Sequence, residues 1–405
     1  MNLAPEAAFR RGPPVGCAPG ARRVDTRGAA RIQCRPGDTD FELMPTATVS
    51  ESDPVTSAPG SLIEPPGDRR ILAVAAVDAP GGAETTLLRL LGRLRRRGWS
   101  VTLATPGDGP LRAAGESAGH RCLALPVGGL AAGAGARAVA SWPQARRLAG
   151  AADVIYLNGG VCGRLLPALA GSRARRVLHV HDLVTRVPRF WRLADVVLAA
   201  SGAVSDRLGS LPAHVVYGPV DPDPPTVSPP WTPDGAPVVG FVGRIEPRKG
   251  AMDLVRAAPA IRAGAPGARV IVVGDDPYCT DPAYTAAVTG SPEIEHHGWL
   301  DNAPGLMRHL DVLVLPSHDE PFGTVLAEAM AVGTPVVATR VGGLAEVVDD
   351  GVTGRLVAPG DPAALAAAVL EVLRQRERMG AAARERARRF DADRYAEHVE
   401  RLLAV

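Results

Sequence analysis

The sequence predicts two doubly wound, Rossmann-like α/β domains that face each other across a cleft. Two series of short apolar runs alternate with helical segments, the first over residues 70–218 and the second from residue 238. Continuous apolar runs separated by helices are typical of parallel strands covered on both faces. A proline-rich stretch, DPDPPTVSPPWTPDGAP at 221–237, separates the two series and predicts the linker.

The domain boundaries follow from composition. Residues 1–67 are rich in Pro, Gly, Arg, Ser and Thr and lack an apolar period, which predicts a disordered N-terminal extension, with Met44 as an alternative start. We expect an N-terminal domain over 68–220 and a C-terminal domain over 238–378. The last segment, 379–405, is predicted to form one or two closing helices.

Each expected strand is an apolar run of its own. In the first domain the runs are 70–77, 100–105, 121–125, 153–158, 176–181, 195–201 and 214–218. In the second domain they are 238–244, 269–275, 294–299, 311–317, 335–339 and 354–359. Helices are predicted between most strands of the first domain, and in the second domain at 250–263, 303–309, 323–332 and 361–379.

The two predicted domains carry opposite charge. Residues 68–220 hold 20 arginines against nine acidic residues, a net +11, whereas residues 221–405 carry a net −8. Opposite signs suggest that the two domains meet different partners. Almost all of the positive charge is arginine, and Lys249 is the only lysine in the chain, which singles it out.

Composition also excludes some classes of protein. No apolar run reaches the ~18 residues of a membrane span, and no signal-peptide pattern opens the chain, so we expect a soluble, cytoplasmic protein. Five scattered cysteines form no C-x-x-C pair, which argues against a zinc site. The arginines of the N-terminal extension lack interleaved aromatic residues, so nucleic acid is not an expected partner.

The stretch from Pro316 to Gly343, PSHDEPFGTVLAEAMAVGTPVVATRVGG, predicts a strand end, a loop, a short helix and a second strand. Glu320 lies just before the helix, and Glu328 lies about 7 Å further along the axis at 1.5 Å per residue. Gly323 lets a ligand approach the first N–H groups of the helix, which form an anion site with the helix dipole. Two carboxylates around a phosphate cradle suit a ligand made of sugar, diphosphate and ribose.

This stretch resembles the signature of the family 4 retaining glycosyltransferases, which have the GT-B fold of two Rossmann-like domains. The resemblance covers about residues 70–380. It implies that Glu320 holds the hydroxyls of the donor sugar and that Glu328 holds the ribose. It also implies that the diphosphate is bound by N–H groups at Phe322, Gly323 and Thr324. By the same resemblance, the first domain is the acceptor side and the second binds the nucleotide sugar.

A second motif, VGRIEPRKG at Val242–Gly250, follows the first strand of the second domain. Arg244 and Lys249 are five residues apart, and both can reach one diphosphate at the ends of the strands. Two cations directed at a leaving diphosphate would stabilise the charge that develops on it. The alternative is a solvated basic loop, which the isolated lysine disfavours. The resemblance implies that both residues bind the donor diphosphate.

Two motifs of the first domain are expected to face the donor. Gly81 and Gly82 follow the first strand and permit a close backbone approach at a helix start; the family carries a similar glycine loop. LHVHD ends a later strand and places His181 at its carboxyl end. His179 shares the same face, so either imidazole could be the functional one. The resemblance implies that His181 contacts the donor.

Gly342 and Gly343 follow the second strand of the signature, where they either let backbone approach the donor or form a tight turn. Asp221-Pro222-Asp223 imitates a metal-binding D-x-D but lies in the linker, and GT-B enzymes generally need no metal. We therefore expect neither a metal nor a cofactor. One departure from the family is Tyr217, where an asparagine is common.

The sequence thus predicts a retaining glycosyltransferase with a catalytic set of His181, Glu320, Arg244 and Lys249. Its acceptor is unknown; the basic first domain points to an anionic or lipid-linked acceptor and to peripheral contact with an anionic membrane. Two alternatives stay open. One is a sugar-nucleotide epimerase on the same scaffold, and the other is a non-catalytic protein that binds nucleotide sugars.

Overall fold

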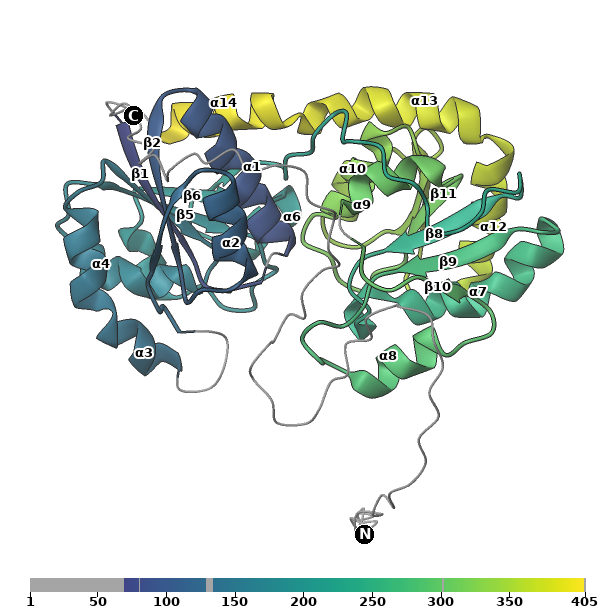
Figure 1. Cartoon of the computed structure of the whole chain (residues 1–405), viewed down its shortest axis with the longest axis horizontal. Helices are drawn as coiled ribbons and strands as arrows, with labels where there is room; N and C mark the ends of the chain where they lie inside the picture. The colour runs from purple at the N-terminus through teal and green to yellow at the C-terminus, as the bar shows by residue number, and fades with distance from the viewer. Residues whose placement is uncertain (1–68, 80, 129–133, 301, 404–405) are drawn as a thin grey trace, which may run out of the picture. The chain divides into compact units, whose positions relative to one another are not determined.

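The computed structural model describes residues 69–79, 81–128, 134–300 and 302–403, which lie within one compact unit of the chain, Asp53–Val405 (Figure 1). The predicted extension over 1–67 lies outside the described residues. Within them, helices alternate with the strands of two parallel sheets, which confirms the predicted fold class. None of the described helices combines the length and the apolar character that crossing a bilayer requires.

The first sheet has seven parallel strands in the order β3-β2-β1-β4-β5-β6-β7. Its strands are β1 Arg69–Ala75, β2 Trp99–Thr105, β3 Arg121–Ala124, β4 Val154–Asn158, β5 Arg175–Val180, β6 Val196–Ala199 and β7 His214–Val215. The helices between them are α1 Gly82–Arg96, α2 Pro110–Ser117, α3 Ala134–Ala140, α4 Trp142–Ala149, α5 Leu166–Leu169 and α6 Gly202–Arg207. Because the strand order reverses between β1 and β4, the carboxyl end of this sheet has the switch point at which open α/β sheets bind ligands.

The second sheet repeats this plan with six parallel strands in the order β10-β9-β8-β11-β12-β13. Its strands are β8 Val238–Val242, β9 Arg269–Val273, β10 Glu295–His296, β11 Val312–Leu315, β12 Val336–Thr339 and β13 Gly354–Val357. Its helices are α7 Ala251–Gly264, α8 Pro282–Thr289, α9 Ala303–Leu306, α10 Thr324–Ala331, α11 Leu344–Val347, α12 Pro362–Arg374 and α13 Arg376–Ala387. Here the switch point lies between β8 and β11.

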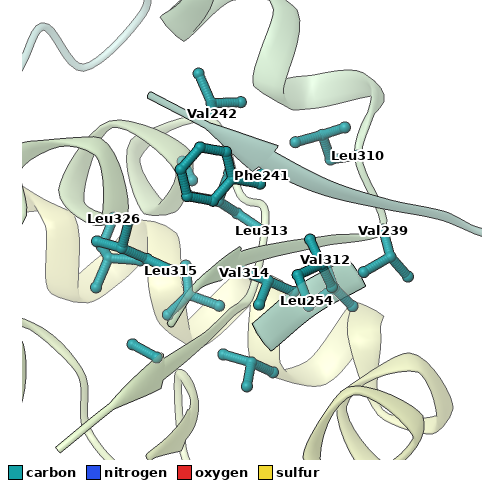
Figure 2. Close-up of a cluster of buried hydrophobic side chains, with 14 of the residues drawn as sticks. Val239, Phe241, Val242, Leu254, Leu310, Val312, Leu313, Val314, Leu315 and Leu326 are labelled. Carbon is teal, nitrogen blue, oxygen red and sulfur yellow. The ribbon is translucent and has the colours of Figure 1, made fainter. Parts of the chain in front are cut away.

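The strands are apolar throughout because both faces of each sheet are covered. All four residues of β11 are at most 1% exposed. Figure 2 shows Phe241 of β8 in one cluster with side chains of β11, with Leu254 of α7 and with Leu326 of α10. Strands held this firmly on both sides give the loops at their carboxyl ends fixed starting points.

The last helix, α14 Ala392–Leu403, packs on the first sheet although it follows the second in sequence. Tyr395 and Val399 join the apolar cluster that contains Leu87 of α1. Glu400 is 8% exposed and accepts a hydrogen bond from Trp99 Nε1 at 2.9 Å. A buried carboxylate with a paired donor anchors this end of the helix.

The chain passes between the two sheets twice, because α14 returns to the first sheet. Both passages lie at the same place. Val220 N–H donates to the Phe390 carbonyl at 2.8 Å, and Ala392 N–H donates to the Val220 carbonyl at 3.1 Å. The segment that leaves the first sheet is therefore paired with the segment that comes back to it. We call this pairing of residues 220 and 390–392 the chain crossing.

Besides the short α11, which the predicted helix ranges leave out, two helices of the second domain differ from the sequence prediction. The helix predicted over 361–379 breaks at Gln375, whose φ of −120° and ψ of +15° separate α12 from α13. Helix α8 was not predicted, although Asp281 caps it by accepting from Tyr284 N–H at 3.0 Å. The local signal for α8 is an aspartate followed by a proline, the usual N-cap and first helical residue.

Candidate active site

Two loops of the second domain meet at the carboxyl edge of its sheet. They follow β8 and β11, which are neighbours in the sheet, so the two loops start side by side. His318 N–H donates to the Arg248 carbonyl at 2.8 Å, and the Arg248 guanidinium donates to the Asp319 carbonyl at 2.9 Å. These bonds bring the two strongest motifs of the sequence into one site.

Lys249 and Glu320 form a nearly buried ion pair in this site. Lys249 Nζ lies 2.5 Å from Glu320 Oε2, and the two side chains are 14% and 8% exposed. Gly250 permits this approach of the loops, because its φ is +70° and a Cβ there would overlap the Pro316 carbonyl oxygen. An anion beside the pair could share the lysine, while the carboxylate accepts hydrogen bonds from hydroxyl groups.

Arg244 lies on the same loop as Lys249 but outside the ion pair. Its guanidinium is 3.5 Å from Glu246 Oε1 and lies over the Tyr278 ring, 5.6 Å from the centroid. Burial raises the pKa of Glu84, at the start of α1 in the first domain, and the charge of Arg244 acts in the opposite direction. Arg244 therefore acts electrostatically on the first domain.

Helix α10 begins at Thr324, and its N-cap residue is a glycine, which has no side chain to bond to the first N–H groups of the helix. Gly323 precedes it with a φ of +87°, and a Cβ there would overlap the Leu344 side chain. Phe322 is buried, and its ring stacks on Tyr217 with centroids 5.8 Å apart. The unusual Tyr217 therefore supports the loop that leads into α10.

Gly342 and Gly343, in the loop after β12, pack against the loop that carries Glu320. Gly343 N–H donates to the Glu320 carbonyl at 3.0 Å. A Cβ at Gly342 would overlap the Glu320 carbonyl oxygen, and a Cβ at Gly343 would overlap that of Pro321. Close contact between the two backbones accounts for both glycines, and it fixes the main chain of Glu320. Their approach to a donor stays a prediction.

Glu328 lies apart from the Lys249–Glu320 pair. Its Oε1 accepts from the Arg89 guanidinium at 2.7 Å, and the two side chains are 13% and 12% exposed. Burial raises the pKa of Glu328, while the charge of Arg89 acts to lower it. Because Arg89 belongs to α1, the second glutamate of the signature is held by a residue of the first domain. No sequence motif singles out Arg89.

Gly81 and Gly82 open α1 near the carboxyl end of β1. Gly81 N–H donates to Glu84 Oε2 at 3.0 Å, which is the half of a capping box that a glycine N-cap can form. Gly82 is exposed, and a Cβ built there meets no atom within 4 Å. No contact among the described residues therefore requires a glycine at 82, and the space beside it is open to a ligand.

His181 follows β5, and the structure distinguishes it from His179. His179 is completely buried, with Nδ1 2.6 Å from the Tyr156 hydroxyl. The ring of His181 is partly exposed and lies 3.8 Å from that of His179, and its Nε2 is 2.9 Å from Asn158 Oδ1. Burial lowers the pKa of His181 to about 4, so at neutral pH the uncharged ring donates through Nε2 and keeps Nδ1 as an acceptor. This geometry favours His181 as the functional imidazole.

The two domains are in direct contact beside these loops. Ser201 Oγ donates to the Pro321 carbonyl at 2.6 Å. Glu346 accepts from the N–H groups of Gly202 and Ala203, each at 2.8 Å. Neither contact is predictable from the sequence, because a serine before a helix and a glutamate within one both have ordinary local explanations.

The described residues contain no group of three His, Cys, Asp or Glu side chains placed to hold a metal ion. Asp221, of the D-x-D-like sequence, instead accepts from Arg89 at 3.1 Å and from Arg93 at 2.6 Å. At the site, the groups available to balance the charge of a diphosphate are Lys249, Arg244 and the first N–H groups of α10.

Both halves of the chain match known families. Residues 236–375 match the family described as Glycosyl transferases group 1, and residues 80–224 match Glycosyltransferase Family 4. A 2-deoxystreptamine glucosyltransferase of Streptomyces kanamyceticus is 34% identical over 261 residues, which are 58% of this chain and 65% of the relative. A glycogen synthase of Mycobacterium tuberculosis is 41% identical over 138 residues, 33% of each chain. The chain thus spans about a third of the length of the glycogen synthases it matches.

Solved structures resemble the fold over a larger share of the chain. Anabaena Alr3699/HepE in complex with UDP and glucose superposes with a TM-score of 0.71 at 25% identity, over 83% of this chain and 99% of that one. The glycosyltransferase WaaG, involved in lipopolysaccharide biosynthesis, superposes with a TM-score of 0.60 at 18% identity, over 82% and 99% of the two chains. The second likeness bears on the fold alone.

Proposed function

Because the chain belongs to glycosyltransferase family 4, we propose that it transfers a sugar from a nucleoside diphosphate sugar to an acceptor, with retention of configuration and without a metal ion. The observation that carries this proposal is the ion pair of Lys249 with Glu320, whose loop leads into the uncapped start of α10. The lysine and the N–H groups suit a diphosphate, and the carboxylate suits sugar hydroxyls. The Anabaena neighbour, solved with UDP-glucose, makes a UDP-sugar the first donor to test.

In the proposed reaction, the bond between sugar C1 and the diphosphate oxygen breaks. The oxygen of the acceptor hydroxyl bonds to the same face of C1, and its proton passes to the leaving diphosphate oxygen. Lys249, Arg244 and the N–H groups of α10 stabilise the leaving diphosphate. Glu320 orients the sugar, and Glu328 holds the ribose. His181 offers Nδ1 to a hydroxyl near the reacting carbon from the first domain. No protein nucleophile is assigned.

The test is a turnover assay that follows the donor, the released nucleoside diphosphate and the product. UDP-, GDP-, ADP- and TDP-glucose are offered with and without acceptors, including 2-deoxystreptamine and D-inositol 3-phosphate, which the names of curated relatives suggest. We expect diphosphate release that depends on an acceptor, with the product anomer matching that of the donor. Conversion of the donor without an acceptor would indicate an epimerase, and binding without any turnover would indicate a non-catalytic protein.

Replacing Gly82 by alanine is expected to lower donor affinity without destabilising the fold. The new methyl group meets no protein atom, so the stability should change by less than about 0.5 kcal/mol, as at other surface positions. If the donor lies against this backbone, its Kd should rise about tenfold, the effect of about 1.4 kcal/mol of lost contact. Calorimetric titration with the donor and thermal unfolding measure the two quantities.

Gly343→Ala provides the contrasting control. Its methyl group would overlap the Pro321 carbonyl oxygen, so we expect a loss of about 1–3 kcal/mol in stability, the usual cost of overpacking. An unchanged donor Kd in Gly82→Ala would remove the glycine loop from the site. A loss of stability in that variant would show that Gly82 serves packing instead.

The charge of the first domain supports the proposal of an anionic acceptor. This acceptor is either a phosphorylated molecule or a lipid-linked one at the inner face of a membrane. Its net charge of +11 includes the exposed residues Arg173, Arg186, Arg189 and Arg192. Each arginine near an anionic membrane contributes about 1 kcal/mol at low salt. We expect flotation with vesicles of phosphatidylglycerol at 50 mM salt, release at 500 mM, and no flotation with phosphatidylcholine. Absence of binding to anionic vesicles at low salt would leave only a soluble acceptor.

A further inference from the structure

Helix α1 carries a largely buried arginine that the proposed reaction leaves without a role. Arg89 donates to Glu328 Oε1 at 2.7 Å, to Asp221 Oδ2 at 3.1 Å and to the Pro219 carbonyl at 2.9 Å. Its side chain is only 12% exposed. A guanidinium with three partners in two separate segments has a fixed orientation, so its contact with Glu328 is well defined.

Glu328 needs such a partner because burial disfavours a charged carboxylate. Its side chain is only 13% exposed. Burial raises the pKa of Glu328, and Arg89 is the first cause that opposes this rise. A carboxylate must be ionised to accept hydrogen bonds through both oxygens. Without Arg89, Glu328 would be a weaker acceptor for hydroxyl groups.

The contacts that hold Arg89 in place extend to the chain crossing. Asp221, which holds the Nε of Arg89, also accepts from Arg93 at 2.6 Å, and Arg93 contacts Asp393 of α14 at 3.0 Å. Asp221 directly follows Val220 of the chain crossing. The position of Arg89 is therefore tied to the segments that connect the two domains, and not only to its own helix.

We propose that Arg89 is a positioning residue for the donor nucleoside, which holds Glu328 through Oε1 and leaves Oε2 to accept from the ribose hydroxyls. The proposal rests on the proposed function, because it takes Glu328 as the ribose contact. It adds a second contribution of α1 to donor binding, besides the glycine loop at its start. One end of this helix opens at the glycine loop, and Arg89 lies about 10 Å further along its axis.

The test compares the binding of UDP with that of 2′,3′-dideoxy-UDP, which lacks both ribose hydroxyls. Wild-type protein should prefer UDP by about 10- to 100-fold, the usual contribution of hydrogen bonds to a charged group. In Arg89→Met this preference should fall below about threefold, because Glu328 is no longer held as an oriented carboxylate. With UDP-glucose as donor, KM should rise while kcat changes less, which is the pattern of lost ground-state binding.

Arg93→Met is the matched control. Arg93 is also 12% exposed and also binds Asp221, but no contact with Glu328 is found for it among the described residues. Arg93→Met should keep the preference for UDP within about twofold. A substitution that removes no contact with the site usually has little effect. Arg89→Lys retains the charge in a smaller donor, so it should recover part of the preference, and it serves as the test if Arg89→Met fails to fold.

The outcomes separate this proposal from the proposed function. If wild-type protein binds UDP with the stated preference and Arg89→Met keeps it, Arg89 has only a structural role. If Arg93→Met loses the preference to the same extent, the effect belongs to the whole ion-pair network and the proposal is overturned. If wild-type protein binds neither UDP nor GDP nor ADP, the proposed function fails and this inference fails with it.

Discussion

Replacing Lys249 by methionine is expected to lower the rate of sugar transfer by about 10³-fold. Removal of one preorganised group that stabilises a developing oxyanion typically costs 10²–10³ in kcat. Lys249 is also the partner of Glu320, whose side chain is only 8% exposed. Breaking a buried ion pair by removing one partner costs about 3–5 kcal/mol of stability. We therefore expect Lys249→Met to lose both activity and stability.

A double variant separates the two effects. Lys249→Met/Glu320→Gln removes the uncompensated charge, so most of the lost stability should return, whereas transfer should remain as low as in the single variant. Urea unfolding and the turnover assay measure the two quantities. Transfer within tenfold of wild type in Lys249→Met would exclude the lysine from the reaction. Recovered transfer in the double variant would show that Lys249 serves only to neutralise Glu320.

Replacing His181 by alanine is expected to lower kcat by about 10²-fold, as for the loss of one hydrogen bond to the reacting groups. His181 is partly exposed, and burial holds its pKa at about 4, so it acts as an uncharged imidazole at neutral pH. Transfer should therefore show no dependence on the titration of His181 above about pH 6. A rate that rises and falls with a group of pKa near 6.5 would assign His181 a role as a proton donor.

The same lowered pKa makes stability depend on pH. His181 takes up a proton below pH 6.5 in the unfolded chain but only near pH 4 in the folded one. The unfolded state therefore binds more protons between these values, so stability is fully present above about pH 6.5 and is lost as the pH falls toward 4. His181→Asn should reduce this slope, and the remaining histidine contribution should come from His179, His297 and His398, whose pKa values burial also lowers. A slope unchanged by the substitution would place His181 in solvent.

The strands could be predicted closely because parallel strands buried on both faces are continuous apolar runs. The run predicted over 311–317 contains β11 Val312–Leu315, and the run over 335–339 contains β12 Val336–Thr339. The break between α12 and α13 could not be predicted, since Gln375 is a good helix former. The direction of α13 is set by close packing elsewhere in the helix, because a Cβ at Gly380 would overlap the Gly333 carbonyl oxygen.

The site was predicted as separate motifs, and the structure adds their partners. Lys249 and Glu320 are 71 residues apart, so their contact depends on the order of strands in the sheet. Glu328 was predicted beside the donor, but its partner Arg89 is 239 residues away in the other domain. In the sequence, Arg89 looks like any arginine on an amphipathic helix, because nothing local indicates which face of α1 meets the second domain.

The central claim is that the site around Lys249 and Glu320 binds a nucleoside diphosphate sugar. The most direct measurement is thermal unfolding with UDP-, GDP-, ADP- and TDP-glucose, for wild-type protein and for Lys249→Met/Glu320→Gln. A donor at 100 times its Kd stabilises the folded state by about 2.7 kcal/mol, so one donor should raise the wild-type Tm by a few degrees and leave the double variant unmoved. If no donor raises the wild-type Tm, or if the double variant shows the same rise, the assignment of this site is wrong.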